Sequence, residues 1–158
     1  MLRQEITSHP QWNTAFSTNI DRWLADRQRL LVEYCDLSRT SNSDDPALIC
    51  AEKLRHLCQT LIDYVSAGHF GIYDQLMHEG QINQAKEALI EASRHFSLVD
   101  KTTDDVLDFN DKYLETDDLT VLIEDLSRLG EILEARFSAE DSMISVLHRQ
   151  SANPRTLN

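Results

Sequence analysis

The stretch LCQTLIDYVSAGHFGIYDQL, residues 57–76, decides the fold class of this chain. Its apolar residues recur every three or four positions, which is the spacing that gathers side chains on one face of an α-helix. Traced back to Leu54, that face consists of Leu54, Leu57, Cys58, Leu61, Val65, Gly68, Ile72 and Leu76. The spacing therefore predicts a long helix that buries this stripe in a helical core.

The same helix carries a second set of residues about 180° away from its core stripe. This outward set is Asp63, Ser66, Ala67, Phe70, Asp74 and Met77, with His69 and Tyr73 on its two flanks. A helix that packs on one neighbour needs no large apolar residue on its far side. Phe70 and Met77 therefore indicate a second contact, made either by another helix of the same bundle or by a separate partner.

Helical patterns extend over most of the chain. We predict four helices, over residues 12–37, 46–79, 83–114 and 119–150, joined by short connections. No stretch alternates with the period of two that is typical of strands. Short connections favour antiparallel neighbours. The prediction is one all-α domain over residues 1–158, an antiparallel bundle of about four long helices whose tail at 152–158 is frayed.

The composition excludes several classes of protein. Hydrophobic residues make up 41% of the 158 residues, which is not a disordered composition, and no apolar run is long enough to span a membrane. The N-terminal residues lack the apolar centre of a secretory signal. Three cysteines without CxxC spacing do not indicate a disulfide framework or a zinc site. We therefore expect a cytoplasmic protein.

The formal net charge of −12 bears on the kind of partner. Direct binding to nucleic acid requires Lys and Arg that neutralise phosphates, so this charge argues against it. An acidic surface can instead bind a basic partner, although the same charge also promotes solubility. Charge alone leaves both explanations open.

Two charged residues fall inside predicted core stripes. Arg27 lies on the core face of the first helix, and Glu140 lies on that of the fourth. The apolar members of these faces are Phe16, Ile20, Trp23, Leu24, Leu31 and Tyr34 on the first helix, and Leu119, Leu122, Leu126, Leu129, Leu133, Phe137, Ile144 and Leu147 on the fourth. A lone buried charge is very costly. We therefore predict a structural ion pair between Arg27 and Glu140, with a partly open polar pocket for a ligand as the alternative.

No enzyme or metal motif is present. The chain contains no GxSxG, P-loop or HExxH sequence. His56, His69 and His78 do not share one helix face, and EARFSAED (134–141) has no following histidine at ExxH spacing. We therefore predict no catalytic residue, no metal and no cofactor.

Three segments carry a resemblance to a known family: DRWLADRQRLLVEY (21–34), LCQTLIDYVSAGHFGIYDQL (57–76) and LGEILEARFSAEDSMI (129–144). In this order they resemble the Rsd/AlgQ family of bacterial regulators of sigma D, which are anti-sigma-70 factors. The most specific motifs are DRWLxxR, CQxLxDYxSAGHFxxY and LExRFxxED. The resemblance runs along nearly the whole chain, although the segment SRTSNSDD and residues 80–97 do not contribute to it.

The resemblance implies an all-α bundle that binds the C-terminal region of the primary sigma factor of RNA polymerase (region 4), a basic helix-turn-helix module that recognises the −35 promoter element. Such binding would reduce the use of that sigma factor and favour alternative sigma factors in stationary phase. Some family members are also linked to the phosphotransferase carrier protein HPr and to the stringent response, a link that we assign to no residue of this chain.

The resemblance also implies that the DYxSAGHF segment contributes to the sigma-binding surface, and the outward set points to the same segment. The predicted sigma-binding residues are Asp63, Ser66, Ala67, His69, Phe70, Tyr73, Asp74 and Met77. Their carboxylates would pair with Arg or Lys of the sigma factor, and Phe70 and Met77 would supply apolar contact. The alternative from another class is a helical-bundle sensor of a small ligand or metal, built around His69, Arg27 and Glu140.

Overall fold

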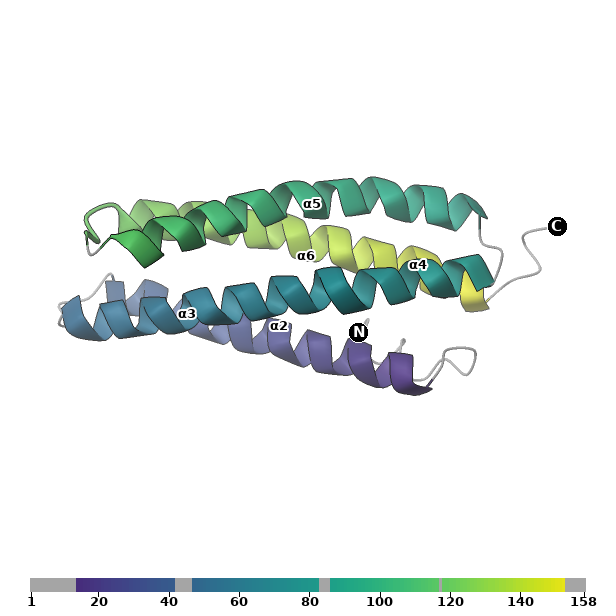
Figure 1. The fold of residues 1–158 in the computed structure, drawn as a ribbon, viewed down its shortest axis with the longest axis horizontal. Coiled ribbons are helices and arrows are strands. Elements are labelled where there is room, and N and C mark those ends of the chain that lie inside the picture. Colours follow the sequence, from purple (N-terminus) through teal and green to yellow (C-terminus); the bar gives the residue numbers. More distant parts are fainter. Residues whose placement is uncertain (1–13, 42–46, 83–85, 117, 153–158) are drawn as a thin grey trace.

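The predicted all-α class is confirmed by the computed structural model, in which the chain forms a bundle of long helices (Figure 1). The structure describes residues 14–41, 47–82, 86–116 and 118–152, and these ranges contain no strand. Their elements are α2 (Thr14–Ser41), α3 (Ala47–Ala67), the π-helix η1 (Gly68–Ile72), α4 (Tyr73–Ile82), α5 (Lys86–Glu115) and α6 (Leu122–Ala152). Residue 12, where the first helix was predicted to begin, and the predicted frayed tail from residue 153 onward lie outside the described residues, as does the side chain of Phe16.

The helices pack around one shared core. α2 packs against α3, α5 packs against α6 along their length, and α3 also contacts α5. α3, η1 and α4 follow one another as a single long rod, and α4 at its end packs against both α5 and α6 (Figure 1). Contacts between α2 and α6 close the ring of helices. No described helix is both long enough and apolar enough to cross a membrane.

The predicted core stripe of the second helix is confirmed. All of its members are buried, from Leu54 through Leu61 to Leu76. On α2 the prediction was partly wrong, because Leu30 and Leu37 are fully buried whereas Leu31 is only half-buried. The buried residues on α2 are three or seven positions apart, namely Ile20, Trp23, Leu30, Leu37 and Thr40. The seven-residue steps match the repeat of helices that pack nearly parallel to one another.

The π-helix η1 was not predicted. A π-turn contains more residues than an α-turn, so the helix face that follows it is rotated relative to the face before it. As a result Tyr73, which a straight helix places on a flank, is buried together with Ile72 and Leu76. Met77, predicted on the outward side, is half-buried and packs against the core.

The turn that precedes α6 explains why this helix begins at Leu122 rather than at the predicted Leu119. Asp118 Oδ1 accepts a hydrogen bond from the backbone N–H of Thr120 at 3.0 Å. The N–H of Leu122 then donates to the carbonyl oxygen of Leu119 at 3.2 Å. Asp118 therefore fixes a turn ahead of the helix, as Asp commonly does.

Cys58 of α3 links core packing to pH. Burial raises the pKa of its thiol from 9.0 to about 11. Because the folded state holds this proton more tightly than the unfolded state, the contribution to stability is complete below pH 9 and is lost as the pH rises through about 11. Between pH 9 and 11 we expect the free energy of unfolding of wild type to fall by roughly 2–3 kcal/mol more than that of Cys58→Ala.

Urea denaturation at several pH values between 9 and 11 measures this difference. Cys35→Ala, which removes an exposed thiol, is the matched control. Its free energy of unfolding should change with pH as that of wild type does. Equal slopes for Cys58→Ala and wild type would contradict the prediction.

Candidate functional site

The predicted outward face lies on α3 and α4. Asp63, Ala67 and Asp74 are exposed, and Ser66 and Met77 are half-buried. Asp63 accepts a hydrogen bond from Gln59 Nε2 on the same helix at 3.0 Å, and this bond leaves the carboxylate at the surface. The side chains of His69 and Phe70 lie outside the described part of the structure, although their backbone forms part of η1. Asp63, Ala67 and Asp74 are therefore the exposed members of the predicted face, with the first two before η1 and Asp74 after it.

Tyr73, which was predicted on this face, lies beneath it. Its side chain is only 3% exposed, and its hydroxyl donates to Glu140 Oε2 at 2.5 Å. The same hydroxyl accepts a hydrogen bond from Arg136 Nη2 at 2.9 Å. Tyr73 is therefore a core residue that holds the start of α4 in place, and it is not part of the exposed surface.

Glu140 is the centre of a buried polar cluster. Its Oε1 accepts hydrogen bonds from Tyr64 at 2.7 Å and from Arg27 Nη2 at 3.2 Å. Its Oε2 accepts from Tyr73 and from Arg136 Nε, the latter at 3.2 Å. A carboxylate offers about four acceptor positions, so the hydrogen-bonding capacity of Glu140 is fully used.

Arg27 and Glu140 are brought together across α2 and α6. Arg27 is 3.2 Å from Glu140, and it also pairs with Asp141, whose Oδ1 lies 2.6 Å from Nη1. The guanidinium lies over the ring of Phe137, 4.8 Å from its centroid. Arg27 therefore closes the outer edge of the cluster, since its side chain is 13% exposed whereas that of Glu140 is fully buried.

Sequence reasoning missed Arg136, although this residue is completely buried. Its Nη1 donates to the hydroxyls of Thr102 and Thr103 on α5, at 3.0 and 2.9 Å. A seven-residue repeat on α6 would have found it, because Leu122, Leu129, Arg136 and Met143 occupy equivalent positions and are all buried. The predicted core face of this helix contained Phe137 in place of its neighbour Arg136, and Phe137 is only half-buried.

The cluster contains two arginines and two carboxylates. Its two arginines face Glu140 and Asp141. Burial and then the charge of Glu140 raise the pKa of Tyr64 and of Tyr73, so both remain hydroxyl donors at neutral pH. Burial alone would lower the pKa of Arg27, but the charges and hydrogen bonds of Tyr64, Glu140 and Asp141 outweigh it and the pKa rises. The arrangement is therefore a structural connection among all the long helices.

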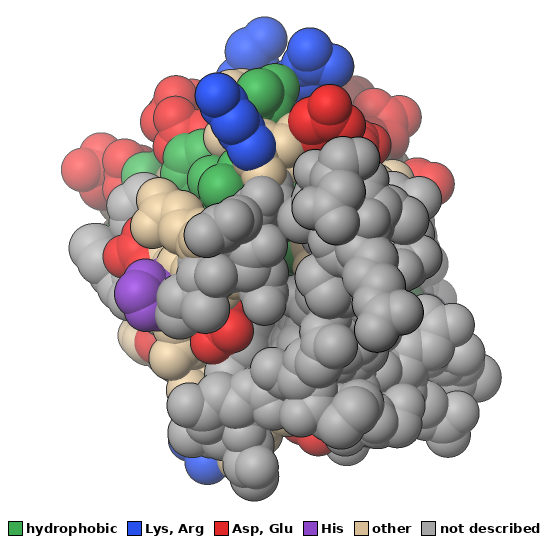
Figure 2. Space-filling model, turned by 90° about the vertical axis from the view of Figure 1, so that its right-hand side faces the viewer, with side chains coloured by type: hydrophobic (Ala, Val, Ile, Leu, Met, Phe, Trp, Pro, Cys, Tyr) green, Lys and Arg blue, Asp and Glu red, His purple; other side chains and the backbone are tan. Residues whose placement is uncertain are grey.

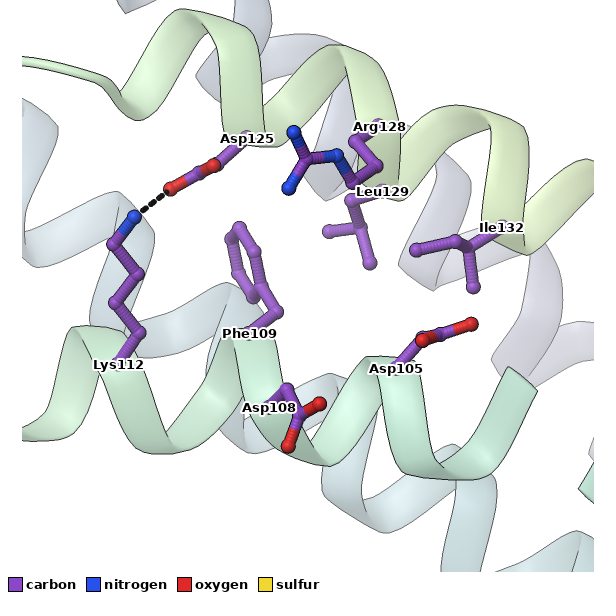
Figure 3. A pocket seen from close by; sticks show the side chains of 8 residues that line it. All are labelled: Asp105, Asp108, Phe109, Lys112, Asp125, Arg128, Leu129 and Ile132. Atoms are coloured by element: carbon purple, nitrogen blue, oxygen red, sulfur yellow. Dashed lines mark hydrogen bonds and ion pairs between the residues drawn. The ribbon is translucent and has the colours of Figure 1, made fainter. Parts of the chain in front are cut away.

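A separate pocket of about 180 Å³ lies between α5 and α6 (Figure 3). Phe109, Leu129 and Ile132 line its apolar part, and Lys112 Nζ bridges to Asp125 Oδ2 at 2.7 Å. Asp105 and Asp108 of α5 and Arg128 of α6 complete the lining (Figure 3). Because cations and carboxylates are mixed around it, the pocket has no strong field that would select a ligand of one sign.

A second surface, on the side of α5, differs from the α3–α4 face because it exposes hydrophobic side chains. Seen from one end of the bundle, hydrophobic side chains lie beside Lys and Arg and near Asp and Glu at the top of the molecule (Figure 2). On α5, Ile90 is 51% exposed and Leu98 is 44% exposed.

Within the described residues, no group of three or more His, Cys, Asp and Glu side chains is placed to hold a metal ion.

Comparison with known proteins gives the family. The family model described as "Regulator of RNA polymerase sigma(70) subunit, Rsd/AlgQ" matches residues 1–148. The chain belongs to this family. A protein named Regulator of sigma D from Pectobacterium carotovorum subsp. carotovorum is 33% identical over 150 residues, which cover 92% of this chain and 95% of that protein.

A Regulator of sigma D from Salmonella paratyphi B is 37% identical over 133 residues, covering 81% of this chain and 80% of that protein. The resemblance found in the three sequence segments is thereby confirmed. The family is described as one of regulators of the sigma(70) subunit of RNA polymerase.

Proposed function

We propose that this Rsd/AlgQ protein binds the C-terminal region of the primary sigma factor and reduces its use by RNA polymerase. The exposed acidic face on α3 and α4, in a chain of net charge −12, is the observation that carries the proposal. The target region is a basic module that recognises the −35 promoter element, so covering it favours alternative sigma factors in stationary phase. Because RNA polymerase works in the cytoplasm, the proposal also places the protein there.

The proposed contact surface consists of Asp63, Ser66, Ala67, His69, Phe70, Asp74 and Met77, with Tyr73 supporting it from the core. Carboxylates such as Asp63 and Asp74 form charge-assisted hydrogen bonds with Arg and Lys. These are the residue types that otherwise contact DNA phosphates and bases. The acidic surface also steers a basic partner toward it, and salt weakens that steering.

The substitution Asp63→Ala tests the proposal. We expect it to weaken binding to the isolated C-terminal region of the primary sigma factor by roughly 1–3 kcal/mol, because a carboxylate at the contact is lost. The Asp63 carboxylate is exposed and bonds to neighbouring Gln59 on the same helix, so the melting temperature should stay close to that of wild type. A binding titration at two salt concentrations measures the effect.

Asp100→Ala provides the matched control, since it removes an exposed carboxylate from α5 and changes the net charge equally. It should retain wild-type affinity apart from a small effect of charge on the association rate. If the Asp63 and Asp100 variants bind equally well, the α3–α4 face is not the contact. If wild type does not bind at either salt concentration, the proposed partner is wrong.

A further inference from the structure

The π-helix η1 changes which side of the rod faces the core after it. From Asp63 to Asp74 the chain advances eleven residues, which make about three full turns of an α-helix, so a continuous α-helix would align these two carboxylates. The extra residue of a π-turn rotates the helix that follows by up to about 100°. The two carboxylates therefore point about a quarter turn apart, and they can contact different parts of one partner.

Two buried residues of this segment suit the core with or without the π-turn. Ile72 and Leu76 belong to the core stripe that a continuous α-helix predicts, and both are buried in the structure. Burying them therefore gives no preference for the π-turn. Because π-helices are rare and occur mostly as single turns, another interaction must hold η1 in place of a continuous α-helix.

Tyr73 is the residue that distinguishes the two conformations, since a continuous α-helix places it on a flank of the core stripe. In the structure its ring makes edge contacts with the rings of Trp23 and Phe96, with centroids 5.9 and 5.6 Å apart. Its hydroxyl donates to Glu140 and accepts a hydrogen bond from Arg136 at 2.9 Å. On a flank the hydroxyl would leave this cluster, and two buried charged groups would each lose a partner.

We propose that the Tyr73 hydroxyl is a positioning group for the proposed sigma-binding surface. Its bonds to Glu140 and Arg136 hold the π-turn, and the π-turn fixes Asp74 at the angle to Asp63 at which both carboxylates contact the partner. Tyr73 acts from beneath the surface, where it is buried. This inference rests on the proposed function, and it makes a buried hydroxyl one determinant of affinity for the partner.

A double-mutant cycle tests this coupling by titration with the isolated C-terminal region of the primary sigma factor. Tyr73→Phe keeps the ring and removes the hydroxyl, and we expect it to weaken binding about three- to tenfold. Asp74→Ala should weaken binding at least about threefold in the wild-type background and have little further effect in Tyr73→Phe. Asp63→Ala lies before the π-turn, so its effect should be the same in both backgrounds.

A purely structural role of Tyr73 would give a different pattern. Loss of folded protein weakens apparent binding without coupling Tyr73 to Asp74. Tyr113→Phe is the matched control, because it removes another buried tyrosine hydroxyl, which donates to Asp125 at 2.5 Å. It should keep wild-type affinity and the full effect of Asp74→Ala. Gly68→Ala crowds the Tyr73 hydroxyl without removing it, since the new Cβ would lie 3.0 Å away, and it should also suppress the effect of Asp74→Ala.

Three results would overturn the inference and leave the proposed function standing. These are normal binding by Tyr73→Phe, normal binding by Asp74→Ala, and an effect of Asp74→Ala that is equally large with and without the hydroxyl. If Tyr73→Phe does not fold, the same cycle in the Gly68→Ala background decides the matter. Absence of wild-type binding overturns the proposed function itself.

Discussion

Replacing Glu140 by alanine is expected to lower the free energy of unfolding by roughly 3–5 kcal/mol. The substitution leaves the fully buried Arg136 without its carboxylate, and it also removes the acceptor used by Tyr64 and Tyr73. A buried charge that has lost its partner is among the costliest defects in a core. Urea denaturation followed by far-UV circular dichroism measures the loss.

The matched control is Glu134→Ala, which removes an exposed carboxylate from the same helix and should change stability by less than about 0.5 kcal/mol.

A double-mutant cycle separates the loss of the ion pair from the loss of side-chain packing. Arg136→Met combined with Glu140→Leu removes both charges, so the pair should be less destabilised than the sum of the two single variants. Additive losses would contradict a strong coupling between Arg136 and Glu140.

Arg27 is the weaker partner of Glu140. Its side chain remains 13% exposed, and its removal leaves Glu140 with Arg136, Tyr64 and Tyr73 as donors. A residue at the edge of a fully hydrogen-bonded cluster contributes less to stability than one at its centre. We therefore expect Glu140→Ala to destabilise the protein more than Arg27→Ala, because it leaves four donors without their acceptor whereas Glu140 keeps three of its donors when Arg27 is removed.

Sequence patterning predicted the helical class and the buried stripe of α3 because both depend on local spacing alone. The proximity of Arg27 and Glu140 followed from the cost of burying a lone charge. Tyr64 and Tyr73 could not be found in that way, since they reach Glu140 through the packing of α3 and α4 against α6. Arg136 lies four residues before Glu140 on the same helix, so its contact is local and was missed only because Arg136 was not placed on the buried stripe.

On α6 most of the predicted stripe is confirmed, because Leu122, Leu126, Leu129, Leu133, Ile144 and Leu147 are buried. It failed at Phe137, which is half-buried, where a seven-residue repeat selects the buried Arg136 instead.

The π-helix is the feature that sequence reasoning could least anticipate. GHFGI at 68–72 contains two glycines within a helical pattern, which signals a weak helix without saying how the helix adapts. The extra residue in the turn moved Tyr73 from the flank into the core. π-turns often occur at functional sites, and here the turn lies between the exposed acids Asp63 and Asp74. The geometry of the π-turn therefore sets the positions of these two carboxylates relative to each other.

The two glycines of this π-helix are expected to respond oppositely to the same substitution. Gly68→Ala should destabilise the protein by roughly 1–3 kcal/mol, because its Cβ would lie 3.0 Å from the Tyr73 hydroxyl and 3.1 Å from the ring carbon that bears it. The ring must shift, which pulls the hydroxyl away from Glu140 and Arg136. Gly71→Ala should be neutral or stabilising by up to about 1 kcal/mol, since its Cβ meets open space and alanine favours a helix.

Chemical denaturation of the two variants gives the sign of each effect, and near-ultraviolet circular dichroism reports the packing of Tyr73 against Trp23. The Gly68 effect should be smaller in a Tyr73→Phe background, because the hydroxyl that a new Cβ would crowd is then absent. Equal responses at Gly68 and Gly71 would mean that helix propensity, and not contact with Tyr73, governs this segment. Opposite responses would show that Gly68 is required for the buried hydroxyl of Tyr73 to reach Glu140, and that position 71 has room for a side chain.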